Sequence, residues 1–220
     1  AQMQEWGKKL ALDVIAQNKS SKIEGEQLQK DKQRFAMELA GKYKLVKVSP
    51  ELTGIAKDTG NENNIRTAAI RALLKTDINK NSLLADELIK TSGTDVDFKR
   101  DVVNVLGEFP GAAVNKVLAG IKSPEPELQQ SVAIALAGTA PGKDILLQKV
   151  RTGEIFPRIL IQPKVEERLS LNISASQQAV LKELTANLED VSKERQTLIH
   201  ERVQAFNAAD PAPSPAVGRT

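Results

Sequence analysis

The residues best suited to chemistry in this chain include a glycine-rich turn near its middle. Residues 138–143 read Gly-Thr-Ala-Pro-Gly-Lys, which resembles a phosphate-binding loop. That motif needs four residues between its glycines and a Ser or Thr after its lysine. Here three residues separate the glycines and Asp144 follows the lysine. Because the segment also follows a helical pattern and not a strand, we expect a turn between two helices.

A single histidine and two pairs of carboxylates are the other candidates for chemistry. His200 lies in a run of charged residues, where a transition-metal site would need further ligands and a catalytic triad would need a nucleophile motif that is missing. The pairs Glu166/Glu167 and Glu189/Asp190 are adjacent in sequence, so their side chains diverge on a helix. We predict no catalytic, cofactor-binding or metal-binding residues in this chain, and no enzyme activity.

Basic and aromatic residues near the N-terminus raise the question of a nucleic-acid or protein partner. Residues 1–48 hold ten Lys and Arg against six Asp and Glu, and the remainder is slightly acidic, for a net charge of +3. A nucleic-acid binder usually carries a concentrated basic face, whereas Lys42, Lys44 and Lys47 form a modest group that a solvated helix end also explains. Trp6 and Tyr43 could contact a partner, but we expect them to pack against helices.

The composition favours stacked helices. Hydrophobic residues make up 40% of the 220 residues and charged residues 27%, but aromatic residues only 3%. A core of Leu, Ile, Val and Ala suits helix packing better than a β-sandwich or barrel. The absence of Cys excludes disulfides and thiolate metal sites, and no apolar run reaches the length of a membrane span.

A repeated helical face is the strongest pattern. In the segments 65–74, 98–107 and 128–137, apolar residues fall at positions i, i+4, i+7 and i+8, which lie on one face of a helix. The first residues of these faces are 33 and then 30 positions apart. The faces consist of Ile65, Ala69, Ala72 and Leu73; Phe98, Val102, Val105 and Leu106; and Leu128, Val132, Ala135 and Leu136.

A shorter amphipathic segment precedes each of these faces, at residues 50–57, 79–90 and 112–121. The unit is therefore a helix pair, repeated three times, whose apolar face must be buried against its neighbours. The period is shorter than the roughly 40–47 residues usual for HEAT repeats, but the tetratricopeptide and ankyrin signatures are absent. Since no alternating strand pattern occurs, the sequence predicts an all-α fold, a HEAT-like right-handed α-solenoid of stacked helix pairs with an armadillo-like superhelix.

Several residues mark the expected helix ends. Ser49-Pro50 can cap and open the first helix of the first pair, and Thr94 can cap the helix that begins near residue 98. Gly153 and Pro157 interrupt the pattern after a helix that contains Ile145, Leu146 and Val150. Ser174 and Gln177 form a capping box before an apolar run that contains Val180, Leu181 and Leu184.

The chain divides into four parts on this reading. Residues 1–48 form an N-terminal helical cap with helices at 2–17 and 23–41, of which the second carries Leu28, Phe35 and Leu39 on one face. Residues 49–139 hold the three HEAT-like pairs and residues 140–209 irregular C-terminal helical repeats. The last of these helices, about 190–208, carries Leu198, Ile199, Val203 and Phe206. Residues 210–220 read as a linker toward a missing downstream domain.

The C-terminal third resembles a known family in three segments: 145-ILLQKVRTGEIFPRIL-160, 165-VEERL-169 and 198-LIHERVQAFNAADPAPSPAVGRT-220. They are similar to the HEAT-repeat segment of large multidomain proteins of Planctomycetes, Verrucomicrobia and Bacteroidetes. In that family a sorbosone-dehydrogenase-like β-propeller precedes the repeats and a c-type haem-binding domain follows them. The haem ligands of that domain are absent here, so the resemblance implies no cofactor in this chain, with c-type haem in the missing downstream domain.

The resemblance implies a periplasmic or secreted, soluble module within a larger haem-containing oxidoreductase-like protein. From it we expect a non-catalytic scaffold, spacer or protein-interaction module whose partners are neighbouring domains or another protein. We expect no nucleic acid, membrane-spanning segment or small-molecule substrate. The alternative is a stand-alone helical repeat domain that binds nucleic acid or protein.

Overall fold

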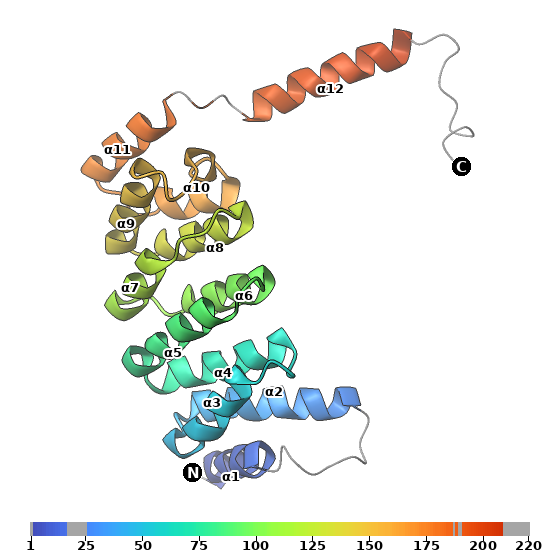
Figure 1. Ribbon diagram of the computed structural model, residues 1–220, viewed down its shortest axis with the longest axis vertical. Coiled ribbons are helices and arrows are strands. Elements are labelled where there is room, and N and C mark those ends of the chain that lie inside the picture. The colour runs from blue at the N-terminus through green and yellow to red at the C-terminus, as the bar shows by residue number, and fades with distance from the viewer. Residues whose placement is uncertain (1, 17–25, 187, 189–190, 209–220) are drawn as a thin grey trace. The chain divides into compact units, whose positions relative to one another are not determined.

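The computed structural model describes residues 2–16, 26–186, 188 and 191–208. Within this part of the chain all regular structure is helical, as predicted, and no strand occurs (Figure 1). The residues of the predicted linker at 210–220 lie outside the described part. None of the described helices combines the length and the apolarity that crossing a membrane requires.

From α3 to α9 the helices follow one another through short turns. Their bounds are α1 Gln2–Ala16, α2 Glu26–Lys42, α3 Ser49–Lys57, α4 Asn63–Thr76, α5 Ile78–Thr91, α6 Val96–Leu106, α7 Ala112–Gly120, α8 Pro126–Leu136, α9 Ala140–Arg151, α10 Pro163–Ser170, α11 Ala175–Thr185 and α12 Val191–Ala208, with short 3₁₀ helices at Val46–Val48 and Pro157–Ile159.

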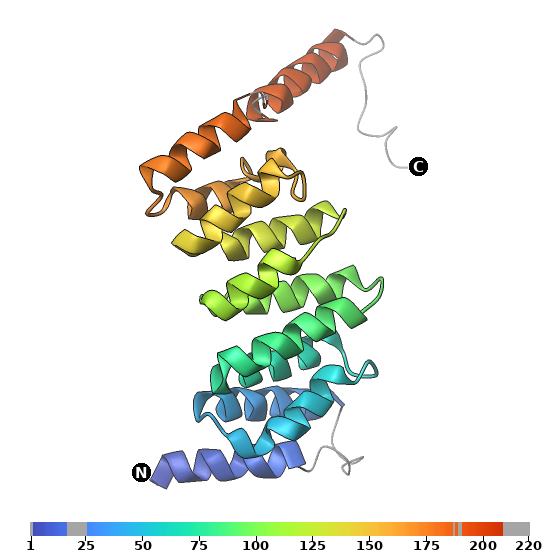
Figure 2. The ribbon, with the colours of Figure 1, turned by 60° about the vertical axis from the view of Figure 1, so that its left-hand side comes forward.

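The chain forms two compact units, residues 1–184 and 185–220. In the first unit α2, α4, α6 and α8 pack side by side in series, and α10 packs on α8. A second row, α5, α7 and α9, lies beside them, while α1 packs on α2 and α3 on α4 (Figures 1 and 2). In the second unit the described residues consist mainly of α12.

The three predicted helical faces are all buried. Each of their twelve apolar residues lies in the continuous core of the first unit. Phe98 is the only aromatic side chain fully buried in the described part of the chain, and the remaining core is aliphatic. The low aromatic content of the sequence therefore corresponds to a core made from Leu, Ile, Val and Ala on stacked helices.

Two predicted helix ends agree with the structure. The backbone N–H of Gln177 donates to Ser174 Oγ and the N–H of Ser174 to Gln177 Oε1, both at 3.2 Å, which is a reciprocal capping box. After α9, Gly153 adopts a φ of +77°. Its N–H donates to the Val150 carbonyl, and the next N–H donates to the Lys149 carbonyl. These two bonds define a Schellman end, which needs a positive φ that glycine provides without strain.

Two predicted caps were wrong by one residue. Ser49 already belongs to α3, and Val48 precedes the helix without a capping side chain; Pro50 does lie in the first turn. Asp95, not Thr94, caps α6, where its carboxylate accepts from the Phe98 N–H at 2.9 Å. A carboxylate accepts a helix N-terminal N–H more strongly than a hydroxyl does, because it is charged.

Two aromatic side chains predicted to pack inside are exposed. Phe35 is 51% exposed, and α2 instead buries Ala36, Met37 and Ala40. Trp6 is 64% exposed, so its packing prediction is also wrong. The predicted role of residues 1–48 as a cap stays a prediction.

Candidate interaction surface

The glycine-rich segment 138–143 comprises the end of the turn between α8 and α9 and the first residues of α9, so the predicted turn is present but shorter than predicted. Thr139 caps α9 by accepting the Gly142 N–H at 3.0 Å. A Cβ on Gly142 would lie 2.1 Å from the carbonyl oxygen of Leu136, so the turn requires a glycine there. Lys143 is buried, and its ammonium group donates to the Leu171 carbonyl. Both the lysine and the glycine are thus committed to packing.

The other candidates for chemistry lie at the surface. His200 is exposed on α12 and its Nε2 is 2.8 Å from the Gln204 amide nitrogen. Glu166 and Glu167 are exposed on α10, and residues 189–190 lie outside the described part of the chain. Among the described residues, no group of three or more His, Cys, Asp or Glu is arranged to hold a metal ion.

Buried charged side chains connect successive helix pairs, which the sequence analysis did not predict. Lys149 is 4% exposed, and its ammonium group donates to the Ile121 carbonyl at 2.9 Å and to Glu154 at 2.7 Å. The guanidinium group of Arg66 donates to the Ala56 carbonyl and lies 3.5 Å from the centre of the Phe98 ring. Both cations satisfy a carbonyl of a neighbouring segment, which is what a buried charge needs.

Buried amides act in the same way. Gln129 Nε2 donates to the Ser123 carbonyl at 2.7 Å, and its Oε1 accepts from the Phe156 N–H at 2.9 Å. Asn81 Nδ2 donates to the Leu73 carbonyl at 2.7 Å. The sequence signal for these residues is a polar side chain next to an apolar face, such as Gln129 beside Leu128.

Ion pairs at the surface repeat this connection between neighbouring helices. Lys57 on α3 pairs with Glu87 on α5 at 2.8 Å, and Arg100 on α6 with Glu127 on α8 at 3.2 Å. A third pair, Arg151–Glu183, joins α9 to α11 at 3.2 Å. Each exposed pair of this kind contributes little to stability, so we expect the pairs mainly to align neighbouring helices.

One surface feature is not explained by packing: a groove between α2 and α4, here called the α2–α4 groove. Two adjoining hollows of ≈ 700 and ≈ 380 Å³ form it and share Glu38 and Lys75. Their floor lies where the two helices approach closely, since a Cβ on Gly41 would be 3.0 Å from the Ala72 Cα. The groove is lined by Asp31, Arg34, Phe35, Met37, Glu38, Gly41, Lys42 and Lys44, by Ala68, Arg71, Ala72, Leu74 and Lys75, and by Thr76, Asp77, Ile78 and Phe109.

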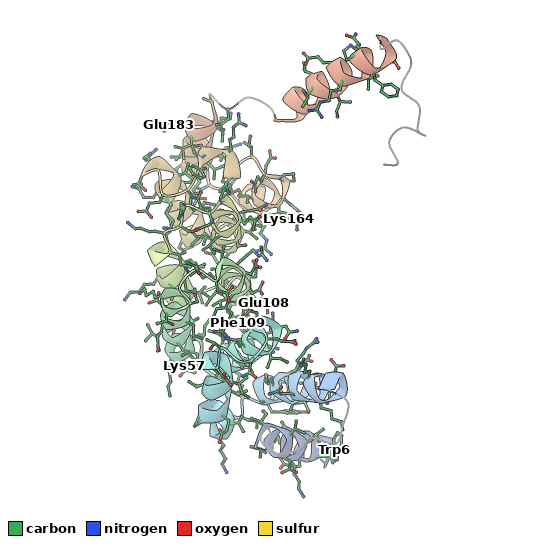
Figure 3. All side chains as sticks on the ribbon, turned by 45° about the vertical axis from the view of Figure 1, so that its right-hand side comes forward. Trp6, Lys57, Glu108, Phe109, Lys164 and Glu183 are labelled. Atoms are coloured by element: carbon green, nitrogen blue, oxygen red, sulfur yellow. The ribbon has the colours of Figure 1, made fainter. Side chains whose placement is uncertain are left out.

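An ion pair borders the groove on the side of α6. Arg71 Nη2 and Nε lie 2.7 and 2.8 Å from the two carboxylate oxygens of Glu108. This bidentate hydrogen bonding raises the pKa of Arg71. Figure 3 shows Glu108 next to Phe109 in the turn after α6, beside the ribbon of α4. The pair thus fixes the turn that carries Phe109 against α4.

The predicted basic group near the N-terminus lies partly in this groove. Lys42 and Lys44 are exposed and line it, whereas Lys47 is exposed outside it. Tyr43 is half-buried, with its ring against the backbone of Gly7, and Lys42 Nζ is 5.9 Å from the ring centre. Tyr43 therefore packs against α1, as predicted, whereas Trp6 is exposed.

The second unit carries exposed apolar residues of its own. Leu198, Ile199, Val203 and Phe206, predicted on one side of the last helix, are between 47 and 61% exposed on α12. They lie at positions i, i+1, i+5 and i+8, which is a broad stripe.

Comparison with known proteins does not assign this chain to a family. No protein-family model matches this chain, and no curated protein or solved structure matches it significantly.

Proposed function

We propose that this chain is a non-catalytic helical-repeat module that binds or spaces other proteins. Its first unit would be a HEAT-like right-handed α-solenoid, in which each helix pair contacts only its neighbours. The serial packing of α2, α4, α6 and α8, with α5, α7 and α9 beside them, supports this architecture. Such stacks present long continuous surfaces, which suit recognition of other proteins.

The observation that carries the proposal is the use of reactive side chains as structural contacts. Lys143 and Lys149, the two buried lysines of the described core, both donate to main-chain carbonyls 28 residues away. Arg66 donates to the Ala56 carbonyl within its own helix pair and lies against the Phe98 ring of the next pair. A catalytic lysine or arginine would instead face a substrate cavity. These side chains are occupied in holding one helix pair to the next.

We further propose, from the resemblance of residues 145–160, 165–169 and 198–220, that the module lies in a larger periplasmic oxidoreductase-like protein. There it would space a β-propeller from a c-type cytochrome. Expression of the longer gene product with haem maturation tests this context. A covalent haem absorption band supports it, and a colourless product contradicts it.

Crosslinking mass spectrometry of the protein in its native host tests the binding role itself. A lysine-reactive reagent would label exposed residues such as Lys116 and Lys164. The proposal expects crosslinks from these lysines to other domains or to a second protein. If all crosslinks stay within residues 1–220, the module does not bind or space proteins and the proposal fails.

A further inference from the structure

We propose that the α2–α4 groove binds an acidic amphipathic helix of a partner protein, with Phe35 as its apolar anchor and Lys42, Lys44 and Lys75 as its cationic contacts. This inference rests on the proposed function as an interaction module. It goes beyond that function because it names the site, the residues and the chemistry of the partner.

The apolar part of the argument is the position of Phe35. Its side chain is half exposed, and it lines the ≈ 380 Å³ hollow beside Ala68 and Ala72 of α4. Small alanine side chains leave the space next to the ring open. Covering apolar surface is favourable by about 25 cal/mol per Å², and aromatic residues beside a pocket are typical anchors of protein interfaces. Phe109 and Ile78 extend this apolar surface to the larger hollow.

The two walls of the groove have the spacing of helix recognition. On α2 the lining residues lie at i, i+3, i+4, i+6, i+7, i+10 and i+11, from Asp31 to Lys42, and on α4 at i, i+3, i+4, i+6, i+7 and i+8, from Ala68 to Thr76. Each wall is therefore one broad side of its helix. A helix laid between two such faces can insert residues of the same spacing.

The charge of the groove favours an acidic occupant because its own acids are already engaged. Asp31 lies 3.6 Å from Arg34, and Asp77 caps α5 by accepting the Lys80 N–H at 3.0 Å. The Glu38 carboxylate interacts electrostatically with the guanidinium group of Arg71.

The lysines have no such partner. Within the described part of the chain, Lys42, Lys44 and Lys75 form no ion pair with a carboxylate of this protein. Lys42 and Lys75 lie in the last turns of α2 and α4, where the helix dipole favours cations, but the dipole does not account for the exposed ring of Phe35 in the same groove. An acidic helix would satisfy the lysines and cover the ring together.

A nucleic acid fits less well. The groove combines the apolar residues Phe35, Phe109 and Ile78 with three lysines, whereas a nucleic-acid binder usually carries a concentrated basic face. Binding to a nucleic acid is therefore the competing outcome of the test.

The test is selection of helical peptides from a displayed library against the full chain, followed by fluorescence anisotropy with each enriched peptide. We expect enriched peptides to combine apolar residues at i, i+3 or i+4 with an excess of Asp and Glu. Phe35→Ala and Lys75→Glu should each weaken binding about tenfold or more, and added salt should weaken it further. Lys42→Glu repeats the charge reversal at an exposed lysine of the groove, whereas the Lys75 side chain lies at the close helix crossing.

Two controls match these variants. Phe156 is 49% exposed, nearly the same as Phe35, and lies outside the groove. Lys116 is exposed on α7 and also lies outside it. Phe156→Ala and Lys116→Glu should leave the affinity unchanged within about twofold. Circular dichroism of every variant confirms that the helices are intact.

The outcomes separate the inference from the proposed function. If peptides bind but the control variants weaken them more than the groove variants do, the groove is not the site, while the interaction module stands. Selected peptides without acidic excess also overturn the inference. If no peptide binds, or if an oligonucleotide binds at low salt and loses affinity in Lys75→Glu, both the inference and the proposed function are overturned.

Discussion

Replacing Phe98 by alanine should destabilise the first unit more than any comparable change at an exposed ring. Phe98 on α6 is fully buried, and the guanidinium group of Arg66 on α4 lies 3.5 Å from its ring centre. Truncation removes the transfer free energy of the ring and leaves a cavity, which together cost about 3–5 kcal/mol for a buried phenylalanine. Loss of the ring from the buried guanidinium group adds about 0.5–2 kcal/mol.

This cost is large compared with the stability of a whole domain, which is about 5–15 kcal/mol. Urea denaturation followed by far-ultraviolet circular dichroism measures the free energy of unfolding. Phe156→Ala is the matched control, because that ring is 49% exposed, and its cost should stay below about 1 kcal/mol. The reasoning is refuted if Phe98→Ala costs no more than Phe156→Ala.

A double-mutant cycle with Arg66→Gln separates the contact from the cavity. The structure predicts that Phe98→Ala and Arg66→Gln are not additive, with a coupling free energy of about 0.5–2 kcal/mol, because the two side chains touch. Additive effects would mean that the ring and the guanidinium group do not interact.

Three further predictions concern turns and buried charges. Gly142→Ala should lower the free energy of unfolding by about 1–3 kcal/mol, because the new Cβ would meet the Leu136 carbonyl at 2.1 Å. Gly54→Ala on helix α3 should instead raise the free energy of unfolding by about 0.5–1 kcal/mol, because its new Cβ would meet no atom within 4 Å. Hydrogen bonding from Lys149 lowers the pKa of Glu154, so its contribution to stability should be complete above the ordinary pKa of 4.5 and be lost as the pH falls through the lower, folded value. Lys149→Met should cost about 1–3 kcal/mol of stability at neutral pH, because a buried carbonyl loses its donor. The same substitution should reduce the loss of stability at acid pH. If urea denaturation gives the variant the same pH profile as the wild type, the last two predictions are contradicted.

The three helical faces are predictable from the sequence because they depend on local spacing. Ile65, Phe98 and Leu128 begin three helical faces in the printed sequence, and each is buried where the spacing predicts. The turn at residues 138–143 was also predictable, since a phosphate loop needs a residue count that this segment lacks. Such features require only residue types and intervals along one helix.

The face of α2 was not predictable in the same way. Large apolar residues suggested that Phe35 and Leu39 face the core, but α2 instead buries Ala36, Met37 and Ala40, and Gly41 stands at its close approach to α4. Which face is buried depends on the neighbouring helix. The α2–α4 groove follows from that choice, so the sequence analysis did not find it.

The buried lysines were missed for a related reason. Lys149 is buried because the Ile121 carbonyl stands opposite it, 28 residues earlier in the chain. A lysine in a helical pattern is usually solvent-exposed, and only the packing of α9 beside α7 provides the acceptor. The local signal for this burial in the sequence was the position of Lys149 between the apolar residues Leu146 and Val150.

The central claim is that helix pairs are held mainly by their nearest neighbours, and hydrogen–deuterium exchange on the full chain tests it most directly. Exchange of the wild type and Phe98→Ala would be compared by mass spectrometry in mild urea, helix by helix. A stack of neighbours predicts that exchange rises most in α4, α6 and α8, which carry or contact the substituted face, and less in α1 and α9. An equal rise in every helix from α1 to α10 would mean a single all-or-none core, and would contradict the stack.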